Sequence, residues 1–307
     1  MSVGATLSSL RRGAGDPCHR TDDAGGVWRA TRTPVGPALL VVRARPQDGE
    51  LAAQAWGPGA PWVLEGVPAL LGADDDPSGF VPAPEHPVLV AAWRHRPGLR
   101  IGRTRAVFDA LVPAALEQRV TGREAHDAWR RLVREFGSVA PGPAGGGAPG
   151  GSAHPAAGMR VPPSPDVWAQ VPQHAWLKAG VDVARRRVVL AAAQVAPRLE
   201  ETLDLSREEA ERRLRSIRGV GIWTSAEVRQ RAHGDADAFS FHDYHVAANV
   251  SWALTGQVLD DAGVAEVIER YRGHRYRVQR LLELDGAGRP RRGPRRTLPT
   301  HLPPGAR

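Results

Sequence analysis

The chain is poor in cysteine and in long apolar runs, and each absence excludes a class of protein. Cys18 is the only cysteine among 307 residues, so no internal disulfide, all-cysteine zinc site or four-cysteine iron–sulfur cluster can form. No window approaches the roughly 20 consecutive apolar residues that a membrane-spanning helix needs. The stretch MSVGATLSSLRRGAGDPCHR also lacks the apolar segment of a signal peptide. We therefore expect a cytoplasmic protein without a membrane partner.

Lysine is nearly absent as well. Lys178 is the only lysine among 41 basic residues, and the formal net charge is +8. Because the arginine guanidinium binds phosphates bidentately and stacks on bases, a nucleic acid is a natural partner for such a chain. Heavy use of Arg, Ala, Gly and Pro also follows from a GC-rich genome, so composition alone leaves the partner open.

Residue patterning divides the chain into four parts. Residues 1–25 are polar and glycine-bearing, which predicts a flexible lead-in. Residues 26–96 hold short apolar runs broken by Pro and Gly. There ALLVVRA predicts a strand and HPVLVAAWRH a possible sheet partner, so we expect a small β-rich N-terminal domain. Residues 286–307 form a basic tail rich in Pro and Arg, which either adds salt-sensitive DNA affinity or is solvated without a role.

The remaining part, residues 97–285, shows helical periodicity. RAVFDALVPAALEQRV and EAHDAWRRLVREFG place apolar residues three and four apart, as on the buried face of a helix. Ser206 opens a later helix, and Glu209 completes a capping box. Residues 140–165, APGPAGGGAPGGSAHPAAGMRVPPSP, predict a flexible loop. Further helices are expected over 244–254, 263–270 and 272–284. The predicted fold class is α+β, with a mostly α-helical core after a small β-rich domain.

Two predicted helices meet at a tight turn in the stretch RGVGIWTSAEVRQRAHGDADAFSFHDYH, residues 218–245. The first helix ends at Arg218, and the second runs from Ile222 to His233, where Gly234 stops it. A lone turn of this kind is better explained as a plain αα-hairpin that needs no ligand.

The turn nevertheless has the features of an anion site. Gly219 and Gly221 let the backbone turn tightly and come close to a ligand. The free N–H groups and the dipole of the second helix favour an anion there, most naturally a backbone phosphate. Thr224 can add a hydroxyl.

A single aspartate among aromatic residues follows the turn. Asp243 lies twenty residues after Trp223, in the apolar and aromatic setting AFSFHDYHVAANVSWAL. As an isolated aspartate at the start of a helix, it would be expected to act as a cap. His242 and His245 flank it, but their short spacing and the lack of further ligands disfavour a metal site. A histidine beside DNA more often contacts a phosphate.

Together these segments resemble the helix–hairpin–helix DNA glycosylase superfamily. Its usual pattern is L-P-G-V-G-x-x-T-A with an aspartate about twenty residues on, here LRSIRGVGIWTSAEV and DADAFSFHDYHVAANVSWAL. The bacterial 3-methyladenine (alkylbase) DNA glycosylase branch is the most similar. PGLRIGRTRAVFDALVPAALEQRVTGREA is similar to its first core helices, PPSPDVWAQVP to a later helix and YRGHRYRVQRLL to its last. The resemblance covers roughly residues 97–284, and residues 26–96 are similar in placement to that branch's N-terminal sheet domain.

The resemblance implies how the chain would hold DNA. Gly219, Gly221 and Thr224 fall where the hairpin of the family holds a phosphate. Arg218 replaces the usual hairpin proline, which loosens the turn slightly and adds a charge near the phosphate. A Na⁺ or K⁺ ion would be bound by the backbone carbonyls of Arg215, Ile217 and Val220. Arg119 falls where a wedge side chain fills the gap left by a flipped nucleotide.

It also implies the catalytic parts. Asp243 matches the catalytic aspartate, while Trp223 and Tyr244 would line the base pocket. Trp223 stands where the bifunctional glycosylase/lyases have a lysine, so no Schiff base should form and the enzyme should be monofunctional. Glu227 and Arg280 stand where other pocket aromatics of the branch would sit, which puts the substrate in doubt.

The implied activity is that of a monofunctional DNA glycosylase that flips and excises damaged, alkylated purine bases in base excision repair. The partner would be double-stranded DNA with damaged bases. The protein would be a monomer associated with the nucleoid and would need no cofactor beyond the hairpin cation. Two alternatives stay open: a glycosylase for a deaminated or oxidised base, and a non-catalytic protein that binds damaged or distorted DNA.

Overall fold

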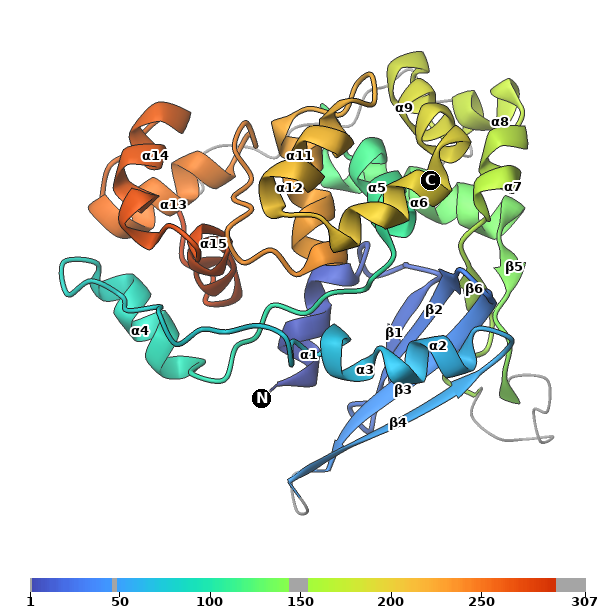
Figure 1. The fold of residues 1–307 in the computed structure, drawn as a ribbon, viewed down its shortest axis with the longest axis horizontal. Helices are drawn as coiled ribbons and strands as arrows, with labels where there is room; N and C mark the ends of the chain where they lie inside the picture. Colours follow the sequence, from blue (N-terminus) through green and yellow to red (C-terminus); the bar gives the residue numbers. More distant parts are fainter. Residues whose placement is uncertain (1, 46–48, 144–153, 291–307) are drawn as a thin grey trace.

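A computed structural model describes residues 2–45, 49–143 and 154–290 and has the predicted α+β fold (Figure 1). An antiparallel sheet near the N-terminus lies below an assembly of helices in the view of Figure 1. Within the described residues, no helix combines the length and the apolar character that crossing a bilayer requires.

The sheet is a meander of four strands in the order β1-β2-β3-β4. Its strands are β1 (His19–Thr21), β2 (Val27–Thr33), β3 (Gly36–Arg45) and β4 (Glu50–Trp56). Side chains alternate between its two faces, and both faces are covered. Leu40 and Val42 pack under helix α1 (Val3–Leu7), whereas Leu39 and Val41 pack against the segment around Met159. This double burial explains why β3 reads as the unbroken apolar run ALLVV.

The prediction of a flexible lead-in at residues 1–25 was wrong for the part the structure describes. Residues 3–10 form α1 and the 3₁₀ turn η1 (Ser8–Leu10), and β1 extends the sheet. Val3 and Leu7 lie four residues apart on α1 and are 4% and 2% exposed. These two apolar residues lie on one face of α1 and pack on the sheet.

The β-rich region is also shorter than predicted. After β4 the chain forms α2 (Ala60–Glu65) and α3 (Val67–Leu70), and HPVLVAAWRH forms α4 (Pro87–His95) rather than a strand. Pro87 is favourable at the first position of a helix, and Leu89 and Ala92 bury one face three residues apart.

The loop predicted at 140–165 is partly structured. β5 (Ser138–Val139) pairs with β6 (Arg160–Val161), and Ala156 and Met159 are buried against the sheet. Residues 144–153 of this loop and residues 291–307 of the predicted tail lie outside the described residues.

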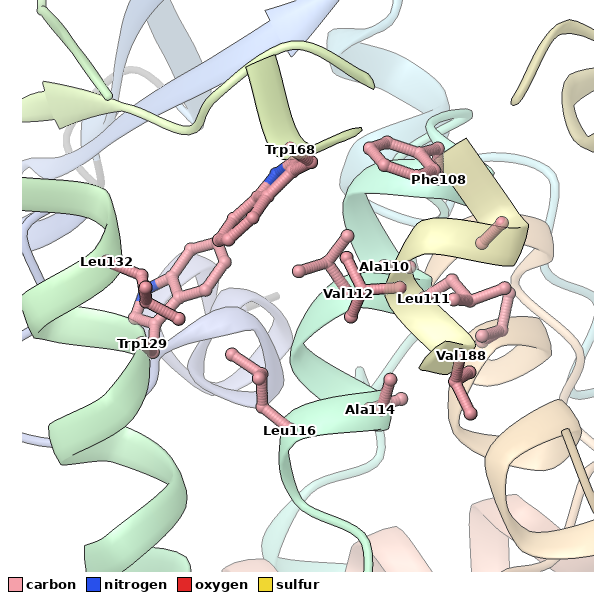
Figure 2. Packing of buried hydrophobic residues seen from close by; sticks show 14 of the residues in the cluster. Phe108, Ala110, Leu111, Val112, Ala114, Leu116, Trp129, Leu132, Trp168 and Val188 are labelled. Atoms are coloured by element: carbon pink, nitrogen blue, oxygen red, sulfur yellow. The ribbon is translucent and has the colours of Figure 1, made fainter. Parts of the chain in front are cut away.

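The helices pack around two apolar cores. The first is formed by α5 (Val107–Leu116), α6 (Gly122–Phe136), α7 (Pro165–Gln170), α8 (Gln173–Lys178), α9 (Val183–Gln194), α10 (Ala196–Glu200), η3 (Glu201–Asp204), α11 (Arg207–Arg215), α12 (Ile222–Val228) and the π-helical turn η4 (Arg229–His233). The second is formed by α4, α13 (Val246–Thr255), α14 (Asp261–Ile268), η5 (Glu269–Tyr271) and α15 (Arg275–Leu284). In the first core, Figure 2 shows Trp168 beside Trp129, with α5 supplying Leu111 and Leu116.

Residues 234–245 connect the two cores. Helices α11 and α12 therefore lie between α13–α15 on one side and α7–α9 on the other (Figure 1). The capping box of Ser206 and Glu209 and the helix stop at Gly234, whose φ is 69°, are both present as predicted. Together these features set the hairpin and Asp243 at the junction of the two cores.

Candidate active site

The hairpin between α11 and α12 has a buried base and a solvent-exposed apex. Ile217 and Val220 are 8% and 5% exposed and join the first core. The Val220 N–H closes the turn by donating to the Ile217 carbonyl across 2.9 Å. Arg218 and Gly219 at the apex are exposed. The turn therefore presents its backbone to solvent on a fixed base.

The two hairpin glycines meet different demands. Gly219 has a φ of 94°, and a Cβ there would lie 2.5 Å from Cγ2 of Val188. Gly221 has φ −94° and ψ −172°, which any residue adopts, and a Cβ there would meet nothing within 4 Å. The fold thus requires glycine at 219 but not at 221. At 221 the glycine leaves open space over the backbone on the side that a ligand can approach.

Thr224 does not lie where a phosphate-binding hydroxyl was expected. It is 3% exposed, and its Oγ1 accepts a hydrogen bond from Nε2 of Gln118 across 2.9 Å. The same Nε2 donates to the Gly219 carbonyl across 3.0 Å. The Thr224 hydroxyl is therefore turned toward the protein, where it helps to shape the hairpin.

Gln118 was missed from the sequence, although it directly precedes Arg119. No spacing rule links a glutamine at 118 to a turn that lies 101 residues further along the chain. Arg119 itself is exposed and has a φ of 57°. A side chain other than glycine in this left-handed region costs on the order of 1 kcal/mol. The structure thus brings Arg119 next to the hairpin in a constrained conformation.

Asp243 is held by three N–H donors. Its Oδ2 accepts from the indole Nε1 of Trp223 across 3.1 Å. Its Oδ1 accepts from the backbone N–H groups of His245 and Val246, at 2.8 and 3.1 Å, at the start of α13. One oxygen therefore accepts from the first N–H groups of α13, as the cap interpretation predicted, and the other accepts from Trp223. The carboxylate has a fixed position at the junction of the two cores.

The two expected pocket aromatics lie differently. Trp223 is half-buried, and its indole N–H is committed to Asp243. Tyr244 is 90% exposed and packs edge-on against the His245 ring, with ring centroids 4.7 Å apart. Tyr244 thus stands on the surface beside Asp243 rather than inside a pocket. Trp252, on α13, is 37% exposed.

His242 is paired within the protein. Its Nδ1 lies 3.1 Å from an Asp261 carboxylate oxygen, and its backbone N–H donates to the other oxygen across 3.0 Å. In the described ranges, no group of three or more His, Cys, Asp or Glu side chains is arranged to hold a metal ion.

Glu227 and Arg280, which replace pocket aromatics, belong to polar networks. Glu227 is 7% exposed, with Oε2 2.7 Å from the Arg231 guanidinium and Oε1 accepting from the Ser240 hydroxyl across 2.8 Å. The Arg280 guanidinium donates to the Ala5 carbonyl on α1 across 3.1 Å. Glu227, one helical turn beyond Trp223 on α12, is therefore a buried and paired polar side chain.

Comparison with known proteins shows which fold this architecture resembles. No protein-family model and no curated protein matches the chain. Among solved structures it is similar to a 3-methyladenine DNA-glycosylase from Archaeoglobus fulgidus, with a TM-score of 0.71 and 17% identity over 92% of this chain and 94% of that one. It is also similar to the 8-oxoguanine glycosylase/lyase of Clostridium acetobutylicum bound to DNA, with a TM-score of 0.66 and 11% identity over 91% and 89% of the two chains. A third is MBOgg1 with a low affinity DNA ligand, with a TM-score of 0.65 and 15% identity over 91% and 90%. The chain has the fold of the helix–hairpin–helix DNA glycosylases, as the resemblance in its sequence predicted.

Proposed function

We propose that this protein is a monofunctional DNA glycosylase that removes alkylated purines from double-stranded DNA in base excision repair. The observation that carries the proposal is the Asp243 carboxylate, held by the Trp223 indole beside an exposed hairpin. A protein that only binds DNA gains nothing from a carboxylate placed near phosphates, because the two charges repel. We expect the protein to act as a monomer on the DNA of the nucleoid.

The proposed mechanism starts with DNA held at the hairpin. A phosphate binds over Gly221, where the backbone is open, and Arg218 adds a positive charge. The target nucleotide swings out of the stack because its glycosidic bond is out of reach inside a duplex. Arg119 fills the space that the nucleotide leaves. Asp243 then stabilises the positive charge that grows on the sugar as the bond breaks, and it orients the attacking water.

The absence of lyase chemistry follows from the absence of a suitable amine. Lys178 is the only lysine in the sequence, and it ends α8. Figure 1 places α8 at the opposite side of the molecule from α13, which begins at the Asp243 site. No side-chain amine therefore reaches the sugar to form a Schiff base.

An alkylated purine suits this site better than a neutral lesion. Its positive charge makes it a good leaving group, so it needs no general acid. The Trp223 ring can stack on a cationic base, and one of the similar solved structures is a 3-methyladenine DNA-glycosylase.

The proposal includes a monovalent cation at the hairpin. Its ligands would be backbone carbonyls of Arg215, at the end of α11, and of Ile217 and Val220 in the turn that follows. The ion would add positive charge next to the bound phosphate. No other cofactor is part of the proposal.

The experiment that tests the proposal is base release from methylated duplex DNA by wild type and Asp243→Asn. Asparagine can keep the cap of α13 but cannot accept from Trp223 through its NH₂ group, so we expect a folded protein with release reduced about a hundredfold or more. Borohydride should trap no covalent complex. If wild type binds DNA and releases no methylated purine, a different lesion or a non-catalytic binding role replaces the proposal.

A further inference from the structure

The loop that carries Arg119 is held on the side of the N-terminal segment. Glu117 accepts from Nη1 of Arg12, whose side chain is 8% exposed, across 3.2 Å, and it lies 3.8 Å from Nε2 of His126 on α6. Directly after the loop, Thr121 begins α6 with a capping box. Residues 117–121 are thus fixed at both ends, and Gln118 and Arg119 lie between these supports.

Gln118 fastens the loop to the hairpin. Its Nε2 donates both to the Gly219 carbonyl and to Oγ1 of Thr224. The carbonyl can only accept, so it determines which end of the amide faces the hairpin. The Gln118 side chain therefore joins the apex of the turn, at Gly219, to the first turn of α12, at Thr224.

Arg119 contrasts with Gln118 in its contacts. In the part of the chain that the structure describes, its guanidinium makes neither an ion pair nor a hydrogen bond, and it is exposed. Its backbone is nevertheless constrained, because a φ of 57° is kept only where the surroundings impose it. A mobile arginine on a free loop would also leave its guanidinium unpaired, but its backbone would not be held at this φ.

We propose that Gln118 is a positioning residue that sets the distance between the phosphate-binding turn and Arg119. Because this distance is fixed, a duplex whose phosphate binds the hairpin has Arg119 inserted at one defined nucleotide step. This assignment rests on the proposed function. It adds that the insertion of Arg119 into DNA depends on Gln118, a side chain that contacts neither the base nor the sugar.

The first test compares binding to a duplex with a tetrahydrofuran abasic site and to the same duplex without it. Gln118→Met keeps the side-chain volume and removes both donors, and Gln118→Ala removes the side chain. We expect wild type to prefer the abasic duplex and both variants to lose about tenfold of that preference, because small misplacements cost large factors. Gln173→Ala, an exposed glutamine on α8, is the matched control and should keep the preference.

The second test separates positioning from simple stabilisation. At saturating protein, 2-aminopurine opposite the abasic site reports insertion through its fluorescence, which a less stable but fully bound protein leaves unchanged. We expect the signal to fall in Gln118→Met and in Arg119→Ala, with no further fall in the double variant. Thr224→Val, which removes one of the two acceptors, should give an intermediate signal.

The outcomes separate the two levels of inference. If wild type prefers abasic DNA and Gln118→Met keeps both that preference and the fluorescence, the positioning role is wrong and the glycosylase proposal stands. Additive losses in the double variant also overturn the positioning role. If wild type shows no preference for abasic DNA, the proposed function fails and this assignment fails with it.

Discussion

Nε1 of Trp223 donates a hydrogen bond to Oδ2 of Asp243 across 3.1 Å. Trp223 belongs to α12, which packs in the first core, whereas Asp243 caps α13 of the second. The bond therefore spans the junction of the two cores. The position of the carboxylate depends on an indole whose expected role, from sequence, was only to line a pocket.

Replacing Trp223 with phenylalanine should separate these two roles. The ring remains available to a base, but Asp243 loses its donor. A hydrogen bond to a charged group contributes about 1.5–3 kcal/mol, so we expect kcat for base release to fall at least about tenfold with little change in DNA affinity. Single-turnover kinetics and a binding titration on the same variant measure both. An unchanged kcat would mean that the indole N–H plays no part.

The two hairpin glycines should respond in opposite ways to alanine. At 219 alanine must adopt a φ of 94° and displace Val188, so the melting temperature should drop by several degrees. At 221 alanine meets no protein atom within 4 Å and should leave the melting temperature unchanged while weakening DNA binding. Thermal unfolding and binding of both variants test the pair. Full DNA affinity in Gly221→Ala would exclude a close backbone contact at that position.

The salt dependence of DNA binding should report on Arg218, which is exposed at the apex of the hairpin. If it contacts one phosphate, Arg218→Ala should make the slope of log K against log salt shallower by about one. Arg94→Ala, an exposed arginine on α4, is the matched control and should leave the slope as it is. Equal slopes for wild type and Arg218→Ala would place the phosphate elsewhere.

Stability should decrease on acidification because of buried histidines. Burial lowers the pKa of His233 to about 4, helped by the nearby Arg229 charge, and burial lowers the pKa of His19 to about 4 as well. Below the unfolded pKa of about 6.5, the unfolded chain takes up protons that the folded chain does not, so stability is lost as the pH falls from about 6.5 toward 4. Each histidine can contribute up to about 3 kcal/mol of this loss.

The matched variant is His233→Gln. Nε2 of His233 lies 3.0 Å from the Thr202 hydroxyl, and a glutamine amide can form the same hydrogen bond without titrating. Urea unfolding at a series of pH values should therefore give a flatter profile for the variant. Identical profiles would show that His233 does not titrate differently in the two states.

Whether a feature could be predicted from the sequence depends on how far apart along the chain the interacting residues lie. The capping box at Ser206, the helix stop at Gly234 and the hairpin glycines are local signals, and the structure has each of them. The contact of Gln118 with the hairpin, by contrast, joins residues far apart in sequence, and no periodicity encodes it.

Other misses have the same origin. The docking of residues 3–10 depends on the sheet beneath Val3 and Leu7, because the segment itself is too short to be stable alone. Thr224 matched a motif position, but its hydroxyl direction is decided by Gln118. Motifs pointed to a candidate site, and only the tertiary structure assigned the partners of its side chains.

The attachment of α1 also bears on how the chain reaches its native state. The carbonyls of Ala5 and Ser9 are bound by Arg280 on α15 and Arg231 on η4, each across 3.1 Å, although the partners lie 275 and 222 positions further along the chain. During synthesis α1 can meet its sheet soon, but the Ser9 contact must wait until η4 has emerged and the Ala5 contact until α15 has emerged. Closure over so long a loop is entropically costly and slow. We therefore expect the contacts of the N-terminal segment with η4 and α15 to be among the last to form.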